Sequence, residues 1–304
     1  MTSLRTTFEN EFLLKDRIQK IRSMDKFDLR GKSYLSFSGG KDSVAVHYLL
    51  DMALPGNRIP RVYFDTGIEY NLMRKFVQQT AEKDDRIKII RSGVNIPEML
   101  REYGYPFKSK EHSQKVALYQ HSGMKNTVRE YLGEGEKTHF LCPKIMRYNF
   151  TEDFHLKVSD KCCTFLKKNV ALRYEEESGK TIAMTGIRQG EQGLRQSMRG
   201  CAVFRDPEGT DLKKFHPLFP CDEEFVRWFI ESNGIRLCEL YYPPYNFKRT
   251  GCKGCPYSLD LQRQLEIMSE HLPAERRQCE LIWGQVYNEY RRIGYRLESN
   301  LFSM

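Results

Sequence analysis

The sequence predicts an α/β protein built on a doubly wound, mostly parallel sheet, and three observations support this prediction. Short apolar runs alternate with amphipathic stretches at helical spacing, which is typical of consecutive βαβ units. Glycine-rich turns follow two of these runs, at the strand ends where parallel sheets bind ligands. The 304 residues are 40% hydrophobic and 29% charged, a balance that indicates a folded chain with a sizeable core.

The expected elements follow this alternation along the chain. Strands are expected at residues 34–37, 61–65, 86–91 and 181–185. Helices are expected at residues 8–24, 44–50, 71–83, 96–103, 111–132, 222–233 and 259–295, the last one split at Pro273. We therefore expect an N-terminal helix (1–28), an α/β domain (29–245) with a helical insertion at about 95–160, and a C-terminal helical cap (246–304).

Charge and cysteine content narrow the function classes. The net charge of +9 favours anionic partners such as a nucleotide or a nucleic acid, although a generic solvated basic surface would carry the same charge. No window approaches about 18 consecutive apolar residues, and the first ten residues lack the apolar core of a signal peptide, so we expect a cytoplasmic protein without a membrane partner. Nine cysteines in such a chain indicate metal binding or catalysis rather than disulfides.

The stretch Ser38-Gly39-Gly40-Lys41-Asp42-Ser43 lies between an apolar run and a helical pattern. Its glycines let the backbone approach a ligand closely, and the start of the following helix presents free N–H groups that favour an anion. Lys41 adds a mobile positive charge, and Asp42 can hold Mg²⁺. The stretch is not a Walker A loop, because Leu35 stands where that motif has its first glycine and Asp42 stands where it has Ser or Thr. An ordinary strand-to-helix turn is the alternative.

The Ser-Gly-Gly-Lys-Asp-Ser pattern resembles the pyrophosphate loop (PP-loop) of the ATP pyrophosphatase and PAPS-reductase superfamily, whose ATP-using members cleave between the α and β phosphates. Two more segments are similar to that family: Asp65-Thr66-Gly67 after the second strand, and the loop from Gly186 to Arg195, which has Gln192 where the family usually has Ser. A plain turn and an exposed basic loop are the alternatives for these segments. The resemblance implies an adenine nucleotide, ATP with Mg²⁺, bound by Ser36, Ser38, Gly39, Gly40, Lys41, Asp42, Ser43, Asp65, Thr66, Gly186 and Arg188. It implies catalytic roles for Lys41, Asp42, Arg188 and Arg195.

Four cysteines form two paired motifs, Cys162-Cys163 and Cys252-x-x-Cys255. Adjacent cysteines seldom pair with each other but can both reach one multi-iron cluster, and the Cys-x-x-Cys spacing lets two sulfurs converge on one metal centre. Four thiolates suffice for a [4Fe–4S] cluster or for a closed zinc site. The arrangement resembles that of iron–sulfur sulfonucleotide reductases and of the ATP pyrophosphatase of DNA phosphorothioation (Dnd-type), and this resemblance favours the iron–sulfur cluster.

Residues 105–137 are polar, basic and aromatic, in a stretch that departs from the strand–helix alternation. Base stacking and phosphate neutralisation use such residues. The candidates for contact with a large polyanionic substrate are Lys108, Lys110, Lys115, Lys125, Arg129 and Lys137, with Tyr105, Phe107 and Tyr119. A solvated helical insertion without a binding role is the alternative.

The leading functional prediction is a PP-loop ATP pyrophosphatase that activates a substrate by adenylylation for sulfur transfer. The resemblance implies a sulfur donor such as a cysteine desulfurase, and it leaves the acceptor open between DNA, tRNA and a small metabolite. Whether the cluster is catalytic or structural also stays open. The first alternative is a sulfonucleotide (APS or PAPS) reductase, although the C-terminal Glu-Cys-Gly-Leu-His nucleophile of those enzymes is absent and the last cysteine, Cys279, falls inside an expected helix. The second alternative is a non-catalytic module that binds a nucleotide or a nucleic acid.

Overall fold

The computed structural model describes residues 6–134, 141–189 and 200–298, and the chain divides into two compact units. The first, here called the sheet unit, comprises Met1–Asp65, Asn71–Arg91 and Val170–Thr250. The second, here called the helical unit, comprises Thr66–Tyr70, Ser92–Asn169 and Gly251–Met304. Each unit is therefore assembled from segments that are distant in sequence. No helix in the described ranges is long and apolar enough to cross a membrane.

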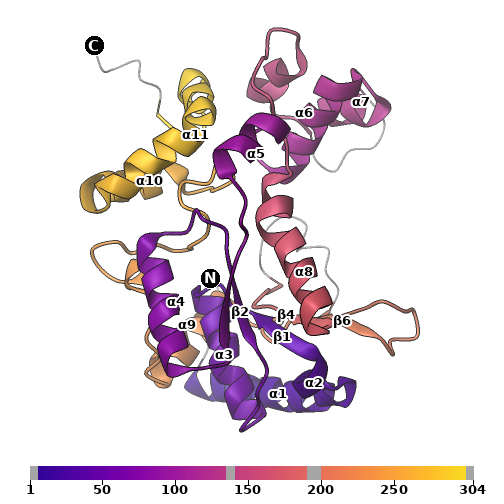
Figure 1. Ribbon diagram of the computed structural model, residues 1–304, viewed down its shortest axis with the longest axis vertical. Helices are drawn as coiled ribbons and strands as arrows, with labels where there is room; N and C mark the ends of the chain where they lie inside the picture. The colour runs from indigo at the N-terminus through magenta and orange to yellow at the C-terminus, as the bar shows by residue number, and fades with distance from the viewer. Residues whose placement is uncertain (1–5, 135–140, 190–199, 299–304) are drawn as a thin grey trace. The chain divides into compact units, whose positions relative to one another are not determined.

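The described part of the sheet unit contains a six-stranded sheet with the order β3-β2-β1-β4-β6-β5. Figure 1 labels four of these strands, β2, β1, β4 and β6. The strands are β1 Ser33–Ser36, β2 Arg61–Asp65, β3 Ile87–Arg91, β4 Ile182–Met184, β5 Ala202–Phe204 and β6 Leu212–Phe215. Neighbouring strands are parallel except β5 and β6, which are antiparallel. The predicted doubly wound, mostly parallel sheet is confirmed, with one antiparallel edge strand, β5, that the sequence patterns do not predict.

The strand order reverses beside β1, which has β2 on one side and β4 on the other. In open α/β sheets such a reversal creates a crevice outside the carboxyl ends of the strands, and ligands bind there. The loops that leave β1 and β4 begin at Phe37 and Thr185, and they carry two of the predicted phosphate-binding segments. The topology thus brings together two motifs that are far apart in the sequence.

The helices of the sheet unit are α1 Thr7–Met24, α2 Leu29–Lys32, α3 Lys41–Ala53, α4 Asn71–Lys83, α8 Asn169–Ser178 and α9 Glu223–Ser232, with short 3₁₀ helices at Asp25–Phe27 and Glu239–Tyr241. Four of them, α1, α3, α4 and α9, lie close to their predicted positions, whereas α8 and the short α2 are not predicted. Thr6 caps α1, because its hydroxyl accepts from Glu9 N–H while the Glu9 carboxylate accepts from Thr6 N–H. Tyr34, Val62 and Ala183, from three adjacent strands, form a buried apolar cluster that joins β2, β1 and β4.

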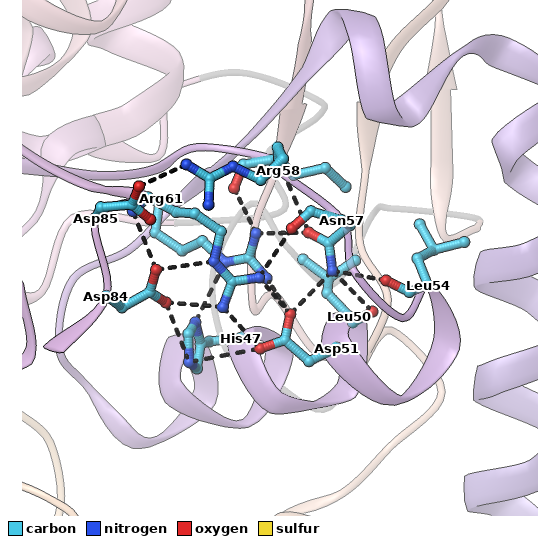
Figure 2. Close-up of polar contacts among 11 residues, drawn as sticks. His47, Leu50, Asp51, Leu54, Asn57, Arg58, Arg61, Asp84 and Asp85 are labelled. Carbon is cyan, nitrogen blue, oxygen red and sulfur yellow. Dashed lines mark hydrogen bonds and ion pairs between the residues drawn. The ribbon is translucent and has the colours of Figure 1, made fainter.

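A buried polar network joins the amino ends of β2 and β3 to α3 (Figure 2). Arg61, the first residue of β2, is fully buried, and its guanidinium donates to Nδ1 of His47 (3.2 Å) and to Asp51 (2.8 Å). Arg86 pairs with the same Asp51 and with Asp84. Burying a guanidinium costs free energy unless its N–H groups have acceptors. Because these acceptors come from different segments, the network holds the amino ends of β2 and β3 in place beside α3. Burial, reinforced by Arg61, lowers the pKa of His47 to about 4, which keeps the ring neutral and able to accept.

The helical unit is built from α5 Ile96–Tyr103, α6 Lys110–Ser122, α7 Asn126–Leu132, α10 Leu261–His271 and α11 Pro273–Ile293, with a 3₁₀ helix at Lys144–Phe150. The single helix expected at residues 111–132 is in fact two helices, because Gly123 adopts a φ of 69° and ends α6. Pro273 stands at the start of α11, where its fixed φ suits a first helical turn, so the predicted split of the C-terminal helices is confirmed.

Candidate functional site

The predicted phosphate loop connects the end of β1 at Ser36 to the start of α3 at Lys41. Gly39 has a φ of 72°, and a Cβ atom on it would lie 2.5 Å from the Met73 sulfur, so the position requires glycine. Gly40 is the N-cap of α3 and has an extended backbone. Together the two glycines make a left-handed turn that leads into the first turn of α3, with the hydroxyls of Ser38 and Tyr241 close to Gly40.

Hydroxyl groups hold this loop in shape. Ser38 N–H donates to Ser43 Oγ (3.2 Å), and Gly40 N–H donates to Ser38 Oγ (3.3 Å). The first amide of α3, Lys41 N–H, donates to the Tyr241 hydroxyl (3.3 Å). The loop is therefore pre-organised by its own side chains, which reduces the conformational entropy that a ligand must remove when it binds.

Four charged side chains meet at the start of α3. The Arg188 guanidinium pairs with Asp42 (2.9 Å) and with Glu223 (2.6 Å), and Lys41 pairs with the same Glu223 carboxylate. Arg188 is buried, whereas the Glu223 side chain is 59% exposed. Burial raises the pKa of Asp42 against the attraction of Arg188 and Lys41. For Glu223, burial also opposes ionisation, but Lys41 and Arg188 outweigh it and hold the pKa below its ordinary value.

Glu223 is a member of this site that sequence reasoning does not single out. It stands in the first turn of α9, far along the chain from Lys41. From the sequence alone it is an ordinary acidic residue at a helix start, where negative charge is favourable. Its carboxylate contacts the two cations, Lys41 and Arg188, that are predicted to bind the phosphates. The structure therefore shows that these two cations can hold one anionic group between them.

The other predicted nucleotide residues are distributed over both units. Gly186 follows β4, and a Cβ atom there would lie 2.8 Å from the backbone carbonyl carbon of Asp42, so the β4 loop packs directly on the start of α3. Asp65 ends β2 in the sheet unit, whereas Thr66 begins the helical unit. Arg195 lies outside the described residues.

All four predicted cluster cysteines belong to the helical unit. Cys162 and Cys163 begin the helical stretch that runs on through a π-helical turn at Thr164–Lys168, and π-helical turns are frequent at functional sites. Cys252 and Cys255 bracket a tight turn, in which Cys255 N–H donates to the Cys252 carbonyl (3.2 Å). The helical unit thus joins two cysteine motifs that are distant in sequence.

The four thiols are close enough to influence one another electrostatically. Burial raises the pKa of Cys162, and negative charge on Cys252, Cys163 and Cys255 raises it further. Burial, with Cys252 as the next contribution, raises the pKa of Cys255 to about 12. Lys167, on the π-helical turn, has its pKa raised chiefly by Cys252, so its ammonium is a positive charge close to these thiols.

A metal site is not complete among these side chains as they are placed. Within the described residues, no group of three or more His, Cys, Asp or Glu side chains is arranged to hold a metal ion. The donor set itself fits a [4Fe–4S] cluster in kind and number, because each of the four irons takes one thiolate. The cluster therefore stays a prediction, supported by the donor set and by the gathering of four buried or half-buried thiols in one unit.

The predicted polyanion-binding residues of segment 105–137 differ in exposure. Phe107 is fully buried, and the Lys108 side chain is half-buried with its nitrogen 3.4 Å from the Tyr131 hydroxyl. These residues face the interior of the helical unit. The exposed basic candidates are Lys110, Lys125 and Arg129, and Lys137 lies outside the described residues. Contact with a substrate would therefore fall to α6 and α7 rather than to the loop before them.

Comparison with known proteins gives two relatives in Methanocaldococcus jannaschii. The uncharacterized protein MJ0973 is 23% identical over 259 residues, which are 82% of this chain and 49% of that protein. The uncharacterized protein MJ0066 is 42% identical over 73 residues, which are 24% of this chain and 15% of that protein. The chain thus spans about half the length of the first relative and much less of the second.

Among the solved structures that match this chain are three enzymes, each 15% identical to it. A PAPS reductase from Candida auris has a TM-score of 0.46 and covers 82% of this chain and 96% of its own. Candida glabrata FMN adenylyltransferase has a TM-score of 0.43, and the match covers 79% of this chain and 63% of that one. The U34-tRNA thiolase NcsA from Methanococcus maripaludis, solved with its [4Fe–4S] cluster, has a TM-score of 0.38, and the match covers 94% of this chain and 80% of that one. At these scores the likenesses carry no argument about this chain.

The family model gives a more definite result. The model of the phosphoadenosine phosphosulfate reductase domain matches residues 32–258, which is most of the chain. The match includes the phosphate loop, the β2 and β4 loops and both cysteine motifs. The chain therefore belongs to the phosphoadenosine phosphosulfate reductase domain family, as the resemblance of its motifs predicts.

Proposed function

We propose that this chain is a PP-loop ATP pyrophosphatase that activates a substrate by adenylylation for sulfur transfer. The observation that carries the proposal is the convergence of Lys41 and Arg188 on one carboxylate, that of Glu223, beside the glycine-rich start of α3. Two cations and a helix N-terminus around one anionic group are what a polyphosphate requires. The proposal concerns the reaction of this chain, which spans only part of the length of its longer relatives.

In the proposed reaction, an oxygen of the substrate attacks the α-phosphorus of ATP. A bond forms between that oxygen and the phosphorus, and the bond to the α–β bridging oxygen breaks, so pyrophosphate leaves with the bonding electrons. Lys41 and Arg188 would neutralise the charge that develops on the leaving group. A sulfur nucleophile then displaces AMP from the adenylylated substrate, so that sulfur replaces the activated oxygen.

The acidic side chains of the site suit a magnesium ion. Mg²⁺ is usually bound by one or two carboxylates together with the substrate phosphates. Asp42 would hold it, and Glu223 stands close enough to contribute, because both carboxylates pair with the same Arg188 guanidinium. When bound, Mg²⁺ stabilises negative charge on the phosphates.

The four cysteines of the helical unit would bind the proposed [4Fe–4S] cluster. Such a cluster either holds a sulfur atom for transfer or supports the fold. A sulfonucleotide reductase is less well supported, because its nucleophilic cysteine must reach the substrate. Cys279, the last cysteine of the chain, is fully buried within α11.

Product analysis tests the proposal. The full chain is incubated with ATP and Mg²⁺, alone and with tRNA or DNA as candidate acceptors. Release of AMP and pyrophosphate is expected, whereas ADP and phosphate would reject the reaction. Tight ATP binding without cleavage under any of these conditions would favour the non-catalytic module instead.

A further inference from the structure

One face of α11 is aligned with the loop that carries Cys252 and Cys255. Cys279, Trp283, Tyr287 and Tyr290 are all fully buried in the helical unit, and they recur every three or four residues along the helix. Residues with this spacing form one continuous stripe on a helix surface. The whole of α11 lies beyond residue 258, where the match to the family domain ends.

Three aromatic side chains of this stripe donate hydrogen bonds to backbone carbonyls of the cysteine loop. Trp283 Nε1–H donates to the carbonyl of Lys253 (3.1 Å), and Tyr287 O–H donates to the carbonyl of Gly254. Tyr290 O–H donates to the carbonyl of Pro256 (3.0 Å). The carbonyls that lie between and directly after the two cysteines therefore each accept from a buried donor on α11, and the Pro256 carbonyl also accepts from Arg296, which follows the helix.

The loop and the helix are in close contact at Gly254. Its φ is 60°, a conformation that favours glycine, and a Cβ atom there would lie 2.7 Å from the Cys279 sulfur. A second anchor is the ion pair between Lys253 and Glu275 (3.4 Å), in which both side chains are almost fully buried. A buried pair of this kind is strongly position-specific, because moving either partner leaves an uncompensated charge.

We propose that α11 is the positioning element of the Cys252–Cys255 thiolate pair, and that Tyr287 and Tyr290 act as positioning residues. Carbonyl oxygens that are bound to α11 cannot turn toward the sulfurs, where they would repel thiolates. The Tyr257 backbone amide is left to face the Cys255 sulfur instead. Outer hydrogen bonds of this type orient metal ligands and tune the bound metal.

This inference rests on the proposed four-thiolate site, and cobalt is a probe that reads the thiolates directly. Reduced, metal-free full chain is titrated with Co²⁺ under anaerobic conditions, and the visible absorption of thiolate-bound cobalt is recorded. Tyr287→Phe and Tyr290→Phe each remove one hydroxyl and keep the ring. Tyr287→Phe should weaken Co²⁺ binding about tenfold, the lower end of the range for outer-shell partners. Tyr290→Phe should weaken it less, because Arg296 still donates to the Pro256 carbonyl.

Tyr295→Phe is the matched control, because the Tyr295 ring packs on Tyr290 (5.2 Å) just after the end of α11. It should bind Co²⁺ as the wild type does. Amide hydrogen exchange of residues 252–257 is the second measurement, and in Tyr287→Phe it should be faster than in the control. Unchanged Co²⁺ affinity in both variants, even with a lower melting temperature, would overturn the positioning role.

The outcomes separate this inference from the proposed function. If wild-type protein binds Co²⁺ through its thiolates and the variants match it, only the role of α11 fails. If wild-type protein gives no thiolate–cobalt absorption, the four-thiolate site and this inference fail together. Cleavage of ATP to AMP and pyrophosphate, measured on the same preparation, tests the nucleotide half of the proposed function independently.

Discussion

Replacing Glu223 by glutamine should make the phosphate loop bind pyrophosphate more tightly. The wild-type carboxylate occupies Lys41 and Arg188, the two cations that a phosphate group would need. An incoming anion must therefore displace it or bind beside it against charge repulsion. Glutamine keeps the size and hydrogen-bonding shape of the side chain but removes its charge, so both cations become available.

The size of the effect follows from the exposure of the carboxylate. Unit charges about 4 Å apart attract by about 1 kcal/mol in water and more in a protein interior. Because the Glu223 side chain is 59% exposed, each of its two ion pairs is worth no more than about 1 kcal/mol. Releasing both should gain about 1–2 kcal/mol, which corresponds to roughly tenfold tighter binding.

Isothermal titration with pyrophosphate, in a chelator and at fixed ionic strength, measures this gain. Glu224→Gln is the control, because Glu224 is the neighbouring acidic residue in the first turn of α9 and its loss changes the net charge equally. With Mg²⁺ the gain should be smaller, because the metal neutralises the carboxylate. If Glu223→Gln binds metal-free pyrophosphate no more tightly than Glu224→Gln does, the phosphate site does not lie at Lys41 and Arg188.

Three further predictions concern other parts of the chain. Protein purified without oxygen should be brown and contain about four irons, as a four-cysteine cluster requires; Cys252→Ser should lower the iron content, and stoichiometric zinc in a colourless protein would contradict the cluster. Binding to tRNA or DNA should weaken steeply as salt is added, and charge reversal at Lys110, Lys125 and Arg129 should lower the affinity further and make it less dependent on salt; salt-independent binding would argue for a small acceptor. The pKa of His47 is lowered from 6.5 to about 4, so the unfolded chain takes up this proton at a higher pH than the folded chain does. Through His47 alone, the free energy of unfolding should therefore fall by about 3 kcal/mol as the pH falls from about 7 to 4. Urea titrations should show a weaker pH dependence for His47→Asn than for the wild type, and an equal pH dependence would show that His47 is not the cause.

Much of the sheet can be predicted because its information is local. Strands β1 to β4 are short apolar runs followed by turn residues, and each run falls near its observed strand. The phosphate loop is equally local, since its six residues are contiguous and Gly39 adopts a φ of 72°, a conformation that favours glycine. Strand β5 is missed because Ala202–Phe204 is only three residues long and half-buried, so it has no clear periodicity.

Other features could not be predicted because they depend on tertiary contacts between distant segments. Glu223 reads as a normal first-turn acid, and its position against Lys41 is decided only by how α9 packs near α3. In the same way, Tyr287 and Tyr290 have the helical spacing of core residues, and the sequence does not reveal that their hydroxyls reach the cysteine loop. Arg61 looks like a strand-end cation and is instead the buried centre of a network.

The most direct test of the central proposal is the fate of ATP labelled separately in its α and γ phosphates. Incubated with the full chain, Mg²⁺ and an acceptor, the α label should appear in AMP and in the adenylylated acceptor, and the γ label should appear in pyrophosphate. Lys41→Ala should slow this reaction about a hundredfold or more, because it removes one positioned cation from the leaving group. Release of the γ label as phosphate with ADP as the partner product would contradict the proposed reaction, and an undiminished rate in Lys41→Ala would contradict the role of the phosphate loop.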